Sequence, residues 1–396
     1  MNYIAIAIAI LGTTQQWYNN APVYTTKHWT LRTDLKPSDA NEAGRLLDAV
    51  YEAYRNGLSM LPKKVDDRME AWVFLSKADY NATVQSRTRG DSGVVESSSG
   101  MFFTDKSGLQ ITAVTVADSW KSFERTAKHE AFHQFAHTRF TNKLPQWLNE
   151  GLAEYFEHTT YINGAIVTGQ VGKHELQRLQ QLIRSNSYFP FLEMMRITSN
   201  QWGQGIKGPR GSDQYLQAWS MVHFLIHGDG GTHANQFDRY LVLMSEGMDD
   251  EEAFVKAFDT GDLQSFDRAW ANHVMNLVPS STMIAARRLS YLAAGMLELH
   301  NSGRSANSMN ELRASLQSIQ YNPTLTLQYE DIAFDSSDDK TFTIPKDSYS
   351  LQQPIFIVQK GNPLPTIITQ GLRPYELSVK WEKQNDQISW SIVVGR

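Results

Sequence analysis

Two consecutive segments, residues 122–140 and 145–157, constrain the fold of this chain more than any other part of its sequence. Apolar residues recur three and four positions apart in both, which is the spacing of one helix face. Pro145 suits the first turn of a helix. The connection between the segments is just long enough to turn back, so we predict two neighbouring helices. Their apolar positions are Phe132, Phe135, Ala136 and Phe140 in the first helix and Leu148, Leu152 and Phe156 in the second.

Strand patterns precede these two helices and helical patterns follow them. Residues rich in β-branched and aromatic side chains predict strands at 27–35, 71–80 and 108–118. Two segments rich in glycine, 89–100 and 199–212, are predicted to be loops. Periodic apolar residues predict further helices at 38–58, 173–185, 213–228, 234–248, 249–258 and 263–277.

The C-terminal part differs in character from the rest. Helices are predicted at 283–300 and 308–319, and short strand-like segments separated by proline and glycine follow them. The predicted fold class is therefore α+β, with a small N-terminal mixed sheet, a mostly helical part and a C-terminal β-rich appendage. The length exceeds that of one usual hydrophobic core, so we predict a main domain over 22–280 and a helical linker with a small β-rich domain over 281–396.

Residues 1–21 contain a short apolar run, Ile4 to Leu11. It is too short to span a bilayer, which needs about 20 apolar residues. It could be the core of a secretory signal, in which case the chain is exported to the periplasm or the exterior, but no Lys or Arg precedes it. A buried strand is the alternative, and the sequence leaves the localisation open.

Composition excludes several kinds of site. The net charge is −5 and no Lys/Arg cluster occurs, so nucleic acid and anionic membranes are not expected partners, and no stable membrane span is predicted. Cysteine is absent. A metal site must therefore consist of histidine and carboxylate, a donor set that suits a catalytic zinc ion better than a structural one.

Such donors are concentrated in the first of the two helices. His129, Glu130 and His133 form the pattern His-Glu-x-x-His. Residues four apart lie on one face of a helix, so the two imidazoles could grip one ion. Glu130 is one position further round, close enough to reach a water molecule on the metal but not the metal itself. The alternative is a surface helix with unrelated histidines.

The second helix supplies carboxylates. Glu150 and Glu154 are also four apart and share a face. A catalytic zinc ion takes three protein ligands, and a further carboxylate orients a ligating histidine. We therefore predict Glu150 as the third ligand and Glu154 as the orienting carboxylate. Two solvent-facing acids on a surface helix are the alternative.

Other histidines are weaker candidates. His137 faces the same way as His129 and His133, but a straight helix places it about 12 Å along the axis from His129, too far for one ion. His223 and His227 are four apart on a later helix, but no carboxylate accompanies them. We predict none of these three as a ligand.

The combined pattern resembles the gluzincin class of zinc metallopeptidases. "HEAFHQF", "LPQWLNEGLAEYFE" and "YLQAWSMVHFL" are most similar to peptidase MA-like bacterial proteins, over roughly residues 27–275. The resemblance implies a zincin-like fold, one zinc ion on His129, His133 and Glu150, and Glu130 as the base. It also implies an edge strand that lines the cleft. The strand at 108–118 is the candidate, although its periodicity suits an interior strand equally well.

The expected chemistry is hydrolysis of a peptide bond in a peptide or protein substrate. Glu130 takes a proton from the attacking water, and the leaving amine receives it. No motif fixes the group that stabilises the oxyanion. Tyr215 is our candidate because it begins the helix after the glycine-rich loop, although it could equally be a packing aromatic. Glu154 stands where thermolysin-like enzymes have Asp. The alternatives are a catalytically silent scaffold that acts as a binding module and a hydrolase of a non-peptide amide or ester. The substrate preference and the oligomeric state remain open.

Overall fold

The computed structural model describes residues 17–61, 68–88, 92–140, 142–206, 208, 211–259, 262–327, 329–345, 350–359, 361–373 and 375–395. Most of the apolar N-terminal segment predicted at 1–21 lies outside these residues. The chain divides into two compact units. Unit 1 contains the residues up to His158 and Glu175–Leu277, and unit 2 contains Thr159–His174 and Val278–Arg396. The predicted boundary at 280 is close to the point where unit 2 resumes, whereas no sequence pattern indicates that 159–174 belongs to unit 2.

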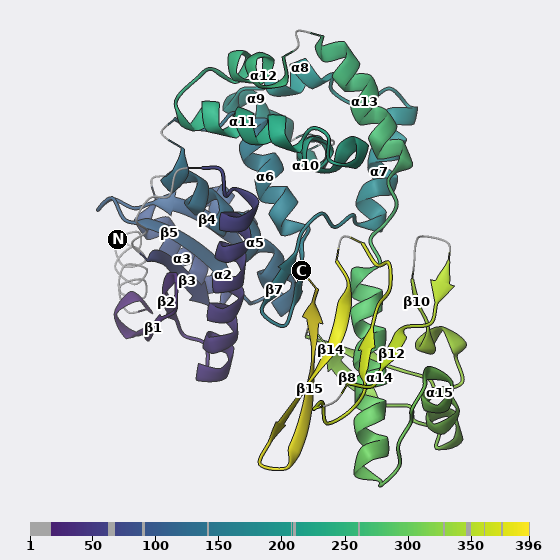
Figure 1. Ribbon diagram of the computed structural model, residues 1–396. Helices are drawn as coiled ribbons and strands as arrows, with labels where there is room; N and C mark the ends of the chain where they lie inside the picture. The colour runs from purple at the N-terminus through teal and green to yellow at the C-terminus, as the bar shows by residue number, and fades with distance from the viewer. Residues whose placement is uncertain are drawn as a thin grey trace. The chain divides into compact units, whose positions relative to one another are not determined.

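Unit 1 begins with a five-stranded mixed sheet in the order β1-β2-β3-β5-β4 (Figure 1). The three inner strands run parallel to one another, and each edge strand pairs antiparallel with its neighbour. The strands are β1 (Val23–Thr25), β2 (Trp29–Thr33), β3 (Met69–Phe74), β5 (Gln110–Thr115) and β4 (Gly100–Thr104). The strand predicted at 108–118 is thus β5, and it is an interior strand; the edge strand is β4.

Helices cover both faces of this sheet, because alternate side chains along each buried strand point to opposite faces. On one face, Thr112 of β5 donates a hydrogen bond to Gln134 of α5 (Trp120–Arg139), and the Trp29 indole donates to a carbonyl of α2 (Pro37–Gly57). On the other face, Trp72 and Phe74 pack with the buried residues of α3 (Lys77–Arg87) and α4 (Ser92–Ser97). The sheet therefore holds α5 firmly along its β5–β4 end.

Local capping explains where the structure departs from the predicted elements. The strand expected at 71–80 ends at Phe74, because Ser76 accepts a hydrogen bond from the Asp79 N–H and starts α3. The loop expected at 199–212 contains α9 (Ser199–Ile206). Its start is a capping box in which the side chains of Thr198 and Gln201 each accept from the other's backbone N–H. Helix α4 likewise lies inside the loop expected at 89–100.

The rest of unit 1 is helical, in agreement with the order of patterns in the sequence. Helix α6 (Gln146–Glu157) packs against both α5 and α10 (Gly211–His227). Gly151 permits this close packing, because a Cβ atom there would be only 2.7 Å from the Ala218 carbonyl oxygen of α10. The remaining helices are α7 (Lys173–Arg184), α8 (Phe191–Met195), α11 (Ala234–Ser245), α12 (Asp250–Phe258), α13 (Leu263–Asn276) and the short 3₁₀ helix η1 (Gly228–Gly230).

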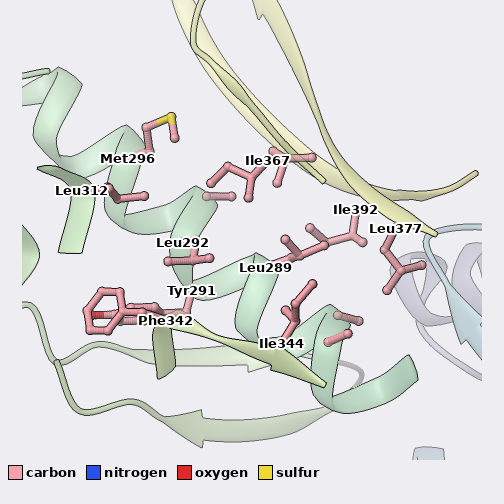
Figure 2. Packing of buried hydrophobic residues seen from close by; sticks show 14 of the residues in the cluster. Leu289, Tyr291, Leu292, Met296, Leu312, Phe342, Ile344, Ile367, Leu377 and Ile392 are labelled. Carbon is pink, nitrogen blue, oxygen red and sulfur yellow. The ribbon is translucent and has the colours of Figure 1, made fainter. Parts of the chain in front are cut away.

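Unit 2 is built around α14 (Thr282–Asn301), as Figure 2 shows. Leu289, Leu292 and Met296 of this helix belong to one buried cluster with Ile367 and Ile392 of the C-terminal sheet. That four-stranded antiparallel sheet comprises β12 (Ile355–Ile357), β13 (Thr366–Ile368), β14 (Leu377–Gln384) and β15 (Gln387–Val394). The other elements are α15 (Met309–Ser318), η2 (Asp339–Phe342) and the hairpins β6–β7 (Thr160–Ile162, Ala165–Val167), β8–β9 (Thr324–Leu327, Glu330–Ala333) and β10–β11 (Ile344–Pro345, Leu351–Gln352).

The protein is thus mixed α+β with a β-rich C-terminal part, as predicted. Among the helices of the described ranges, none has the length and apolar character required to cross a membrane.

Candidate metal centre

Helix α5 places His129 and His133 one turn apart on the same face. The helix begins after Ser119, whose hydroxyl accepts a hydrogen bond from the Ser122 N–H at 3.0 Å. The centroids of the two imidazole rings are 4.8 Å apart. Phe132 is fully buried on the side of α5 that packs against α2 and α6. Packing on that side fixes the rotation of the helix and hence the direction of the histidines.

Helix α6 brings Glu150 to the two histidines. One carboxylate oxygen, Oε2, lies 3.3 Å from His129 Nε2 and 3.6 Å from His133 Nε2. The other oxygen, Oε1, accepts a hydrogen bond from Gln146 Nε2 at 2.8 Å, and Ser199 Oγ donates to Gln146 Oε1 at 2.9 Å. The Glu150 side chain is buried, and the hydrogen bond from Gln146 fixes its Oε1. Only Oε2 therefore faces the two histidines.

The spacing of these three donor atoms fits a metal ion. Donors bonded tetrahedrally at about 2.0–2.1 Å from one ion are roughly 3.3–3.5 Å from each other. The two measured nitrogen–oxygen separations, 3.3 and 3.6 Å, are close to that edge length. One ligand atom from each of His129, His133 and Glu150 lies within 4.8 Å of the others. These residues could therefore hold a metal ion, as the sequence predicted.

The second ring nitrogen of His129 has a different partner from the predicted one. His129 Nδ1 is hydrogen-bonded to Glu157 Oε2 at 3.0 Å, whereas the nearest oxygen of Glu154 is 3.7 Å away. Arg125 donates from Nε and Nη2 to the other oxygen of Glu157, at 3.0 and 2.6 Å. Glu157 follows Glu150 by seven residues, which is two helical turns, so a search of the same helix face could have identified it. His129, Glu154 and Glu157 form a second group of potential metal-binding residues.

The carboxylates make this region favourable for positive charge. Burial opposes protonation of His129, but hydrogen bonds to Glu150 and Glu157 outweigh it and raise the pKa of His129 well above its usual range. Burial would raise the pKa of Glu150, yet the charges of His133 and His129 lower it, so Glu150 remains an anion. Burial and the charge of Glu157 together raise the pKa of Glu154. A cation at the centre would satisfy the carboxylates that surround His129.

Glu130 lies beside the three donors without belonging to their group. Its Oε2 accepts a hydrogen bond from the backbone N–H of Phe102, in edge strand β4, at 2.9 Å. Gly100 of the same strand makes this approach possible: a Cβ atom there would lie 2.4 Å from Thr126 Cγ2 and 3.1 Å from Glu130 Cγ. The glycine lets α5 come close enough to β4 to anchor the Glu130 carboxylate.

Tyr215, near the start of α10, reaches the same region. Its ring centroid is 6.4 Å from that of His129, and the Trp202 ring of α9 packs against it edge-on at 5.2 Å. Burial and the charge of Glu150 raise the pKa of Tyr215, so its hydroxyl keeps its proton at neutral pH. A neutral hydroxyl of this kind can donate a hydrogen bond.

The other histidines named in the sequence lie apart from these donors. His137 is exposed, and its ring centroid lies 5.7 Å from that of Phe102. His223 Nδ1 is 3.1 Å from His273 Nε2, and the Tyr155 hydroxyl bonds His227 Nε2 at 2.9 Å. Within the part of the chain that the structure describes, none of these belongs to a potential metal-binding group.

Comparison with known proteins gives one partial family match and no function. Residues 124–247 match the model of a family described as a protein of unknown function, DUF1570. The matched region begins just before His129 and extends beyond α10, so it contains the three donor residues, Glu130 and Tyr215. No curated protein matches the chain closely enough to count as a relative.

Proposed function

We propose that this protein is a zinc-dependent peptidase with a zincin-like unit 1. The observation that carries the proposal is the placement of Glu130. Two histidine nitrogens and one carboxylate oxygen have the spacing of metal ligands, and a separate carboxylate is anchored next to them on the sheet edge. A structural zinc site usually has four protein ligands, whereas the donor group here has three, which is the number found in catalytic sites that keep one position for water.

The proposed ion is zinc, held by His129, His133 and Glu150. Two imidazoles and one carboxylate are a common donor set for catalytic zinc, and cysteine is absent from the chain. A zinc ion bound there supplies Lewis acidity and lowers the pKa of water towards neutrality.

Glu130 is the proposed general base. Its Oε1 is the oxygen that does not bond Phe102, so it can accept a proton from the attacking water. The same oxygen then returns the proton to the nitrogen of the leaving amine. The hydrogen bond from Phe102 keeps the carboxylate in one orientation during both transfers. Tyr215 would donate from its hydroxyl to the oxygen of the substrate carbonyl as negative charge develops.

The edge strand supports a peptide as the substrate. Strand β4 ends the sheet, and its backbone N–H of Phe102 points towards Glu130. An extended peptide can add to such an edge through main-chain hydrogen bonds, which brings its own backbone carbonyls past Glu130. This mode of binding selects a peptide backbone over a compact ester or amide.

The test is hydrolysis of casein and of a quenched fluorescent peptide library by zinc-loaded protein, with and without a chelator. Turnover should require zinc, and Glu130→Gln should retain the ion while losing about 10²–10⁴-fold in rate. Glu246→Gln, an exposed change at the end of α11, is the control and should leave the rate unchanged. Zinc binding without turnover would instead support the silent scaffold. Turnover of esters or simple amides alone would support the non-peptide hydrolase.

A further inference from the structure

We propose that Arg125 and Glu157 are positioning residues that clamp His129 in its ligating orientation, a role that rests on the proposed zinc site. Helix α6 presents two carboxylates to the two nitrogens of one imidazole. Glu150 lies 3.3 Å from His129 Nε2, and Glu157 is hydrogen-bonded to His129 Nδ1 at 3.0 Å. The imidazole therefore sits between two acids that are two helical turns apart on the same face.

The oxygens of Glu157 are divided between two partners. Arg125 donates twice to Oε1, at 3.0 and 2.6 Å, and Oε2 remains for His129. Arg125 precedes His129 by one turn of α5. The guanidinium and the imidazole therefore both form hydrogen bonds with the Glu157 carboxylate from the same face of the helix. About half of the Arg125 side chain is exposed, whereas only 14% of Glu157 is. We call the hydrogen-bonded series Arg125–Glu157–His129 the brace. The Glu157 carboxylate is its buried member, and the Arg125 guanidinium is its solvent-facing member.

Glu154 is less suited to this role. Its Oε1 is 3.7 Å from His129 Nδ1, beyond hydrogen-bond length. Its other oxygen lies 3.5 Å from His158 Nδ1. Glu154 therefore lies between His129 and His158, and its carboxylate oxygens are too far from both imidazoles for a short hydrogen bond.

Only His129, of the two proposed histidine ligands, is hydrogen-bonded within the brace. His133 Nδ1 is buried, and no hydrogen-bond partner for it occurs among the described residues. His129 Nδ1 has an ionised partner that is itself fixed by Arg125. When Nδ1–H donates to a carboxylate, the tautomer is set and the lone pair of Nε2 is directed at the ion with increased basicity. His129 should consequently be the better-organised ligand of the pair.

The experiment measures zinc affinity by competition with a chromophoric chelator, using the full chain. Glu157→Ala should weaken zinc binding by about 10- to 100-fold, and Glu157→Gln, which keeps the shape but removes the charge, by about tenfold. Arg125→Gln should have a smaller effect, and Arg125→Lys should restore most of it, because the lysine can still donate to Oε1. Since Arg125 acts only through Glu157, Arg125→Gln should add nothing to Glu157→Gln in the double variant.

Glu175→Gln is the matched control. Glu175 acts on Arg125 through its charge but takes no part in the Arg125–Glu157 hydrogen bonds. The variant therefore removes a nearby acid and leaves those hydrogen bonds in place. Its zinc affinity should equal that of the wild type. Circular dichroism and urea unfolding should show that all variants fold. The positioning role is refuted if wild-type protein binds zinc and Glu157→Ala binds it equally well, or if the effects of Arg125→Gln and Glu157→Gln simply add. Failure of the wild type to bind zinc would instead refute the proposed function.

Discussion

The close contact between α6 and α10 at Gly151 yields the most quantitative prediction about the support of this site. In Gly151→Ala, the new Cβ atom would lie 2.7 Å from the Ala218 carbonyl oxygen and 2.9 Å from Val222 Cγ2, where ordinary contacts begin at 3.4 Å. One of the two helices must therefore shift by about 0.7 Å, because a backbone carbonyl cannot rotate away. Overpacking of this kind costs about 1–3 kcal/mol, while replacing a helical glycine by alanine returns about 1 kcal/mol.

The expected net destabilisation is about 0–2 kcal/mol, which corresponds to a fall in Tm of up to about 8 °C for a unit of this size. Zinc affinity should fall as well, because Glu150 is the preceding residue. Gly203→Ala, in α9, is the control: nothing lies within 4 Å of a Cβ atom there, so this variant should gain stability by about 0.5–1 kcal/mol. Thermal and urea unfolding of both variants measure the difference. If Gly151→Ala gains as much stability as Gly203→Ala, the close packing of α6 on α10 described above is incorrect.

Two further predictions concern Glu130 and a buried histidine. Gly100→Ala should push α5 away from β4 and break the Phe102–Glu130 hydrogen bond, which lowers kcat/KM per bound zinc ion by about 10- to 100-fold. An unchanged kcat/KM per zinc ion would argue against this anchor. Burial, helped by the charge of His273, lowers the pKa of His227 from 6.5 to about 4. The folded state therefore favours neutral His227, and its contribution to stability is complete above pH 6.5 and is lost as the pH falls towards 4. Between pH 7 and 5 the wild type should lose roughly 2 kcal/mol more than His227→Gln in urea unfolding, and equal losses would contradict the assigned burial.

The parts of the site that sequence could predict are those that depend on one helix at a time. His129 and His133 are four residues apart in a His-Glu-x-x-His motif, and Glu150 lies on the next apolar-patterned helix, so periodicity, the motif and the three-ligand rule for catalytic zinc together predict them. The sequence does not predict Glu157, because Glu154, one turn from Glu150, is the simplest candidate for the orienting carboxylate. The choice between Glu154 and Glu157 depends on how α5 and α6 cross and on Arg125, and neither is visible in a local pattern.

In the fold, too, features set by local sequence can be predicted, whereas features set by contacts between distant elements cannot. The α+β order and the positions of most helices follow from local periodicity, but the interior position of β5 depends on β4, which is short and comes directly after a glycine- and serine-rich segment. The glycines of residues 199–212 predict a loop rather than helix α9, although Thr198 and Gln201 form a capping box at its start. The assignment of 159–174 to unit 2 depends on packing with residues more than a hundred positions later, such as that of Ile162 in the cluster around α14.

His129, His133 and Glu150 are proposed to form one metal site, and the zinc content of the purified chain is the most direct measurement of it. After zinc loading and desalting, elemental analysis should find about one ion per wild-type chain. The double variant His133→Ala with Glu150→Ala removes two of the three donors and should retain almost none, while remaining folded by circular dichroism. A wild-type chain that retains no zinc, or a double variant that retains as much as the wild type, would contradict the account.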